Sequence, residues 1–209
     1  MKFTPEFKEA ISHLSSKEKD KLILRLLKKD LVLANRLHFE LVNTNSIDTE
    51  REKIEQRIIE RSKNIGDSFY SMGYLNMDVR YLSGEITEHV QITKDKFGEA
   101  SLNILLLIET LKNNKHHIEG ASLAKSRKFC VAVIARCFKI LLLIDKLDSD
   151  YLIEFEENLK KLGILIGDID VLMKIAIHHG FDVNWFISAT IPDDIVSYHK
   201  ELRQRGYLK

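Results

Sequence analysis

Apolar residues recur along this chain at spacings of three and four, and no stretch alternates apolar with polar residues in the manner of a half-buried strand. The most apolar segment, 122–147, contains neither glycine nor proline and is apolar around most of a helical wheel. A second segment, 96–111, is apolar on nearly every side. We therefore expect two central helices at 96–111 and 122–147, covered by the rest of the chain.

The N-terminal part of the chain carries start signals for three short helices. Thr4 is followed by Pro5 at the first helical position, and Ser15 with Glu18 forms a capping box. Asp30 precedes a leucine-rich third helix. The connections between these helices are short, which is typical of antiparallel hairpins.

The longest periodic segment, 48–90, repeats apolar residues every seven positions and is expected to begin at an Asp48 cap. We predict one long helix or two nearly collinear helices, broken near 73–76 or at Gly84. Three glycines would share one flank of a continuous helix, where another backbone could approach: Gly66, Gly73 and Gly84.

The side opposite this apolar repeat carries three tyrosines, Tyr70, Tyr74 and Tyr81. Aromatic residues at helical spacing usually pack internally, so we expect these tyrosines in a core. The alternative is a partner-binding surface, where tyrosine is enriched, and a self-complementary two-fold contact would make the chain a homodimer. Three carboxylates could form the polar rim of such a surface: Asp67, Asp78 and Glu85.

The C-terminal segment, 148–209, carries signals for four further helices. Gly163 and Gly180 are expected directly after the first two helices, and Asp168 is expected to cap the second. Trp185 lies in a short third helix, and a last helix follows. The most polar connection of the whole chain is 113–120, which we expect to be a surface loop and the place for a functional loop.

Composition supports a helical protein throughout. Two prolines and nine glycines among 209 residues leave little material for a fold rich in turns. We expect one all-α domain over 1–209, built of stacked antiparallel helical hairpins as an irregular bundle or a short α-solenoid-like array. Its sub-units would be 1–47, 48–147 and 148–209.

The formal charge of +1, with both signs interspersed, gives no electrostatic footprint of a non-specific nucleic-acid binder. One line of cations lies on the central helix: Lys125, Lys128, Arg136, Lys139 and Lys146. We expect these cations to be solvated or paired with carboxylates of the next helix, Glu154, Glu156 and Glu157. The alternative is an anchor for an acidic or phosphorylated partner. Charges inside the segment exclude a membrane span.

Histidines lie near carboxylates in three places: His89 with Glu85 and Glu88, His116 and His117 with Glu119, and His178 and His179 with Asp182. None of these clusters has the spacing of a helical zinc hydrolase or a di-iron bundle. The chain also lacks a nucleophile elbow and a phosphate-binding glycine loop. We therefore expect no catalytic, cofactor-binding or metal-binding residue, with a helical metal-dependent hydrolase as an alternative.

One segment, 157–173, resembles a helix-turn-helix in the order of its apolar residues: Leu159, 162–164, Ile169 and Leu172. The following segment, 180–186, is similar to the one that closes phage-repressor-type DNA-binding domains. The resemblance implies a nucleic-acid-binding regulator. Asp168 and Asp170 would stand at the groove-facing end of the recognition helix and oppose phosphate, so a plain helical hairpin is favoured.

The two cysteines, Cys130 and Cys137, would lie about 10 Å apart along one helix, too far to form a disulfide. We expect buried thiols in a reducing cytoplasm, and because the start of the chain is polar we expect no signal peptide. With no strong catalytic motif and two candidate contact surfaces, the sequence favours a non-catalytic interaction or scaffold protein whose partner it does not identify.

Overall fold

The computed structural model describes residues 2–209, and within this range the regular structure is helical, without a strand. The predicted all-α class is confirmed. The helices run as follows: α1 Pro5–Ser12, α2 Ser16–Leu27, α3 Leu31–Val42, α4 Ile47–Asp67, α5 Met72–Thr93, α6 Lys96–Gly120, α7 Leu123–Ile144, the 3-10 turn η1 Ser149–Tyr151, α8 Leu152–Gly167, α9 Asp170–His178, α10 Asn184–Ile187 and α11 Ile195–Gln204.

The chain divides into two compact units. The N-terminal unit comprises the residues up to Thr44 together with 91–93, and the main unit comprises 45–90 and 94–209. The prediction of a single domain with three sub-units stays a prediction.

The three helices of the N-terminal unit begin where the sequence signals place them. Thr4 Oγ1 accepts a hydrogen bond from the N–H of Phe7, and the capping box of Ser15 and Glu18 is formed in both directions. The Asp30 carboxylate accepts a hydrogen bond from the N–H of Leu33. No residue of α1, α2 or α3 is buried within the described chain.

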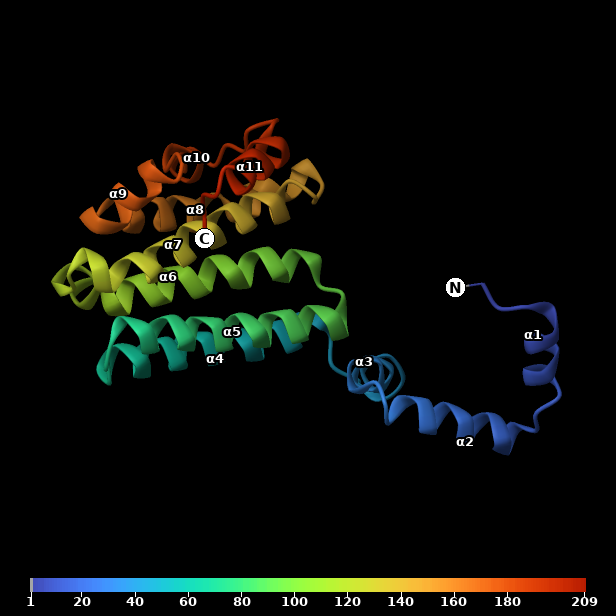
Figure 1. The fold of residues 1–209 in the computed structure, drawn as a ribbon. Coiled ribbons are helices and arrows are strands. Elements are labelled where there is room, and N and C mark those ends of the chain that lie inside the picture. The colour runs from blue at the N-terminus through green and yellow to red at the C-terminus, as the bar shows by residue number, and fades with distance from the viewer. Residues whose placement is uncertain (1) are drawn as a thin grey trace. The chain divides into compact units, whose positions relative to one another are not determined.

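In the main unit, α6 and α7 are the central helices, as predicted. Leu106, Leu107, Ile134 and Leu141 of these two helices are completely buried. The pair α4 and α5 packs on one side of α6, and α8 to α11 cover α6 and α7 from the other side (Figure 1).

The prediction of one long or two collinear helices over 48–90 is wrong. α4 ends at Asp67, the chain reverses over 68–71, and α5 returns antiparallel to α4 (Figure 1). The cause is a second start signal: the Ser71 hydroxyl accepts a hydrogen bond from the N–H of Tyr74. A seven-residue apolar repeat continues across such a turn without a change of phase, so the repeat alone does not reveal the hairpin.

Two predicted details near this hairpin are also corrected. Ser46, and not Asp48, caps α4, because its hydroxyl accepts a hydrogen bond from the N–H of Thr49. The predicted surface loop at 113–120 is instead the C-terminal part of α6, in which Asn114 and Ile118 are fully buried. Two of its polar side chains bond to their own helix: the Asn113 amide donates to the Glu109 carbonyl and the Asn114 amide donates to the Thr110 carbonyl.

In the C-terminal part, Gly163 does not end a helix. α8 continues through it to Gly167, and the glycine has a packing reason instead: a Cβ atom at Gly163 would lie 2.9 Å from Ile187 Cγ1 of α10. Asp168 does not cap α9, which begins at Asp170 after an Ile169 that makes no side-chain cap bond. Gly180 follows α9 with a left-handed φ of 72°, as its predicted position behind the helix requires.

Candidate interaction surface

The three tyrosines of α5 and its preceding turn lie on the surface. Tyr70 is 79% exposed, Tyr74 is 56% exposed and Tyr81 is 69% exposed. Met77, between them at helical spacing, is 46% exposed. We call these four residues the tyrosine face. The expectation that the tyrosines form part of the core is therefore wrong.

Packing of the opposite side of α5 explains this exposure. Leu75, Val79, Leu82 and Ile86 are buried against the rest of the main unit. α5 is an outer helix of that unit, which leaves its other side exposed (Figure 1). Tyr70 and Tyr74 form an edge-to-face pair with ring centroids 4.9 Å apart.

Glycines distinguish the inner and outer sides of the α4–α5 hairpin. A Cβ atom at Gly66 would lie 2.7 Å from the carbonyl oxygen of Asn113, so α4 and α6 approach closely there. Gly84 has no neighbour within 4 Å of such an atom, and Gly73 has only the hydroxyl of Ser71 at 3.7 Å. The approach of another backbone is thus real at Gly66, whereas Gly73 and Gly84 are on the exposed side of α5.

Charges flank the tyrosine face in matched pairs. Arg57 of α4 lies 3.4 Å from Glu85, and Arg61 lies 3.6 Å from Asp78. These pairs use two of the three carboxylates expected at the rim. Arg80, on the exposed side itself, is the cation next to Tyr81.

A hollow lies beside Tyr70, where the α4–α5 turn meets the end of α6 and the start of α7. Phe69 and His117 stack in it with centroids 4.0 Å apart and planes 10° from parallel. His117 Nε2 lies 3.3 Å from the Gly66 carbonyl oxygen, and His116 and Lys125 complete the polar lining. The stack anchors the turn that carries Tyr70.

The cations of the predicted line on α7 have different surroundings, and their role as an anchor for a partner stays a prediction. Lys139 Nζ pairs with Glu99 Oε1 of α6 at 3.0 Å, and not with Glu154, Glu156 or Glu157 of the next helix. Arg136 is half-buried, and burial lowers its pKa while the guanidinium stays protonated. Lys125 and Lys128 are exposed, and along residues 2–209 no carboxylate lies at ion-pair distance from either.

A buried polar cluster that the sequence did not reveal joins α4, α5 and α6. Arg51 donates to both oxygens of Asp95, at 2.6 Å and 3.0 Å, and the Gly98 N–H donates to the same carboxylate at 2.8 Å. His89 Nε2 lies 3.2 Å from it. Burial raises the pKa of Asp95, but the bonds from His89, Arg51 and Gly98 outweigh this effect and hold it well below its usual value. The position of Asp95 directly before α6 indicates a helix cap from the sequence alone. The pairing with Arg51 could not be predicted, because the two residues are 44 positions apart.

The histidines of the three predicted clusters make different contacts in different parts of the main unit. His89 belongs to the buried cluster, His117 stacks on Phe69, and His179 Nδ1 accepts a hydrogen bond from the N–H of Leu208 at 3.1 Å. Across the part of the chain that the structure describes, no three His, Cys, Asp or Glu side chains are grouped closely enough to hold a metal ion. The turn expected at 162–164 for a helix-turn-helix is not formed, since α8 is continuous there.

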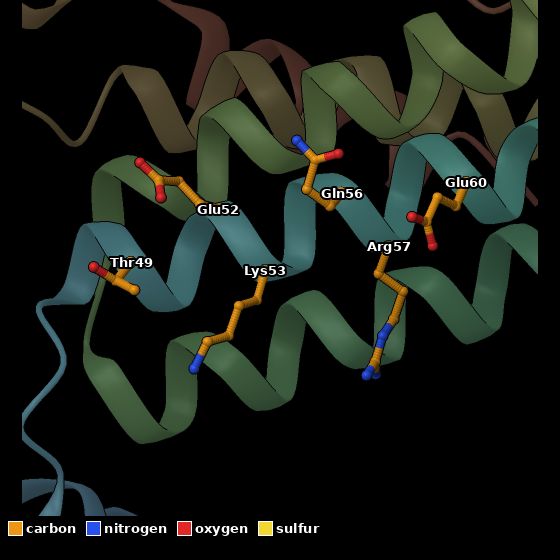
Figure 2. Close-up of a pocket in the computed structure, with 6 residues that line it drawn as sticks. All are labelled: Thr49, Glu52, Lys53, Gln56, Arg57 and Glu60. Atoms are coloured by element: carbon orange, nitrogen blue, oxygen red, sulfur yellow. The ribbon is translucent and has the colours of Figure 1, made fainter.

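A second hollow lies along α4 and is lined by side chains of this helix. Figure 2 shows its six lining side chains: Thr49, Glu52, Lys53, Gln56, Arg57 and Glu60. All of them come from one helix and do not converge on a point (Figure 2). Lys53 forms an ion pair with Glu50 at 2.7 Å, and Arg57 forms one with Glu85. Both cations that line the hollow are therefore already paired with carboxylates.

Between residues 2 and 209, no helix combines the length and the apolar character needed to cross a bilayer. No protein-family model, no curated protein and no solved structure matches the chain.

Proposed function

We propose that the protein is a non-catalytic interaction or scaffold protein that binds a protein partner through the tyrosine face. The observation that carries this proposal is the exposure of three tyrosines and one methionine on one side of α5. Large apolar side chains scattered singly are ordinary on a surface, but a contiguous group marks a contact site. Tyrosine is among the residues that dominate binding energy in protein interfaces.

The rigid attachment of α5 to the main unit also favours binding. The buried residues of α5 hold the helix against the main unit, and a tyrosine has only two side-chain torsions to fix on binding. The ion pairs of Arg57 with Glu85 and of Arg61 with Asp78 lie along one flank. An aromatic centre with a charged border is the usual anatomy of a protein interface.

We place this activity in the cytoplasm. Both cysteines are free and buried, and burial raises the pKa of the Cys130 thiol to about 12. A protonated thiol is a poor nucleophile, so these residues act as small core side chains, consistent with a reducing compartment.

Photo-crosslinking tests the proposal. The amino acid p-benzoylphenylalanine replaces Tyr74 or Tyr81 in the full chain expressed in cells, and irradiation traps the proteins in contact. Tyr151 is the matched control, because it is a 47% exposed tyrosine on a different part of the main unit. We expect discrete protein adducts from positions 74 and 81 that are absent from position 151 and disappear when Met77→Asp is added. Adducts that are absent, identical at all three positions or insensitive to Met77→Asp would refute the proposal.

A further inference from the structure

The three helices of the N-terminal unit are short and expose apolar side chains. α1 has eight residues, and α2 and α3 have twelve each. Helices of this length are marginally stable in water unless one side packs against another surface. None of the three buries a residue within the described chain, and large apolar side chains are exposed on each: Phe7, Ile11, Ile23, Leu24, Leu26, Leu31, Val32, Leu33, Leu41 and Val42. The physical chemistry of these helices therefore calls for an apolar surface to bind.

Charge is concentrated on one side of α2. Four exposed cations lie within about 80° of one another around this helix and its C-terminal cap: Lys17, Lys21, Arg25 and Lys28. We call these four residues the basic side of α2. Within residues 2–44, the ion pairs join other side chains, His13 with Glu9 and Arg36 with Glu40. The basic side is therefore available to an anionic partner.

The opposite side of α2 is apolar. Ile23 lies about 160° from Arg25 around the helix, and Leu26 and Leu27 lie to either side of it. Lys19 shares this side in the first turn, where its Nζ donates to a backbone carbonyl oxygen at 3.1 Å. α2 thus combines an apolar side with a basic one, which is typical of helices that lie on membrane surfaces.

The balance of charge differs between the two parts of the chain. Residues 2–44 contain nine Lys or Arg and six Asp or Glu, which gives a formal charge of +3. Because the whole chain carries +1, the remaining residues carry −2. Attraction to an anionic surface would therefore act on the N-terminal part of the chain.

We propose that α2 binds the surface of a membrane that contains anionic phospholipids. Its apolar side enters the boundary between headgroups and acyl chains, and its basic side remains among the phosphates. The helix lies on the bilayer and does not cross it. A fluid bilayer also suits apolar sides on separate short helices, because it imposes no fixed shape on them. This surface is separate from the tyrosine face, so either proposal can fail without the other.

Flotation of the full chain with lipid vesicles tests the proposal. We expect binding to vesicles of phosphatidylcholine with phosphatidylserine, little binding to phosphatidylcholine alone, and weaker binding at high salt. Each cation near an anionic membrane strengthens binding about fivefold, so Lys21→Glu with Arg25→Glu should weaken it at least about thirtyfold. The matched control is Lys125→Glu with Lys128→Glu, which makes the same change of charge at exposed lysines of α7. It should keep most of the binding.

A second pair of variants tests the apolar side. Ile23→Asp should weaken vesicle binding about tenfold, because the apolar side chain no longer leaves water. Ile153→Asp is the control, since Ile153 is exposed on α8 in the main unit. Both changes are at exposed positions, so the circular dichroism spectrum and the unfolding transition should match those of the wild type.

Three outcomes would overturn the membrane proposal: no binding to the phosphatidylserine vesicles, equal loss of binding in the α2 and α7 charge variants, or unchanged binding of Ile23→Asp. Photo-crosslinking from position 23 then identifies what binds α2 instead. Adducts with another protein would indicate an acidic protein partner, and a crosslink to residues 45–209 of the same molecule would show that the main unit covers α2. Crosslinks from positions 74 and 81 test the tyrosine face independently of these results.

Discussion

Helices α1 to α3 and helices α7 to α9 are stabilised in opposite ways. Each of the first three has a side-chain hydrogen bond at its N-terminus and no buried residue within the described chain. The other three have no side-chain cap bond, yet each buries a continuous apolar side. Capping contributes about 1 kcal/mol per helix, whereas burying a single large apolar side chain contributes about 1.5–3 kcal/mol. A cap therefore determines where a helix begins, and burial determines how strongly it is held.

The largest expected effect contrasts a buried position with an exposed one. Ile134→Asp places an unpaired carboxylate at a fully buried site of α7 and should abolish folding, at a cost above about 4 kcal/mol. Leu24→Asp, at a 60% exposed site of α2, should leave the main unfolding transition unchanged. Urea unfolding followed by circular dichroism measures both. A cooperative transition surviving in Ile134→Asp would mean that α7 is not central.

The buried cluster at Asp95 gives the next largest effect. A methyl group at Gly98 would overlap the Asp95 carboxylate and the Arg51 guanidinium, so Gly98→Ala should break the pair and lower the free energy of unfolding by about 3 kcal/mol. Gly84→Ala is the matched control, because open space surrounds that position. It should be neutral or stabilising by up to about 1 kcal/mol. Equal unfolding midpoints for the two variants would contradict this assignment.

Acid should weaken the same cluster. The pKa of Asp95 is lower in the folded chain than its ordinary value of 3.8, so its contribution to stability is complete at neutral pH. The contribution is lost as the pH falls from about 4 through the folded pKa. Asp95→Asn should cost about 2 kcal/mol at pH 7 and progressively less below pH 4. Urea titrations of both proteins across this range give the difference, and a difference that stays constant would refute the assignment.

Local signals in the sequence predicted the beginnings of several helices correctly. Thr4, Ser15 and Asp30 act within a single turn of chain, so their bonds need no tertiary information. The apolar character of 122–147 likewise predicted that α7 is central. Interactions between residues that are close in the chain are the ones that a single sequence predicts most reliably.

Predictions that depended on distant partners failed. Gly163 has the sequence signature of a helix end, but it is inside α8, where the missing side chain leaves room for Ile187 of α10. The three tyrosines have the spacing of a core stripe, but they are exposed, because the buried residues of α5 lie on its other side and α5 is an outer helix of the main unit. The ion pair of Arg51 and Asp95 spans 44 residues, with no pattern that connects them.

The smallest effect tests the difference between caps and buried sides directly. Ser15 has its backbone N–H 2.9 Å from Glu18 Oε2, and its hydroxyl accepts from the Glu18 N–H, whereas the Ser122 side chain makes no cap bond to α7. Ser15→Ala should therefore weaken α2 by about 1 kcal/mol, seen as faster amide hydrogen exchange confined to that helix. Ser122→Ala should leave the exchange of α7 unchanged, because its N-terminus has no such bond to lose. Faster exchange throughout the main unit in Ser15→Ala would show that the N-terminal unit shares its stability with the rest of the chain. Faster exchange in α7 after Ser122→Ala would mean that this helix also depends on its cap.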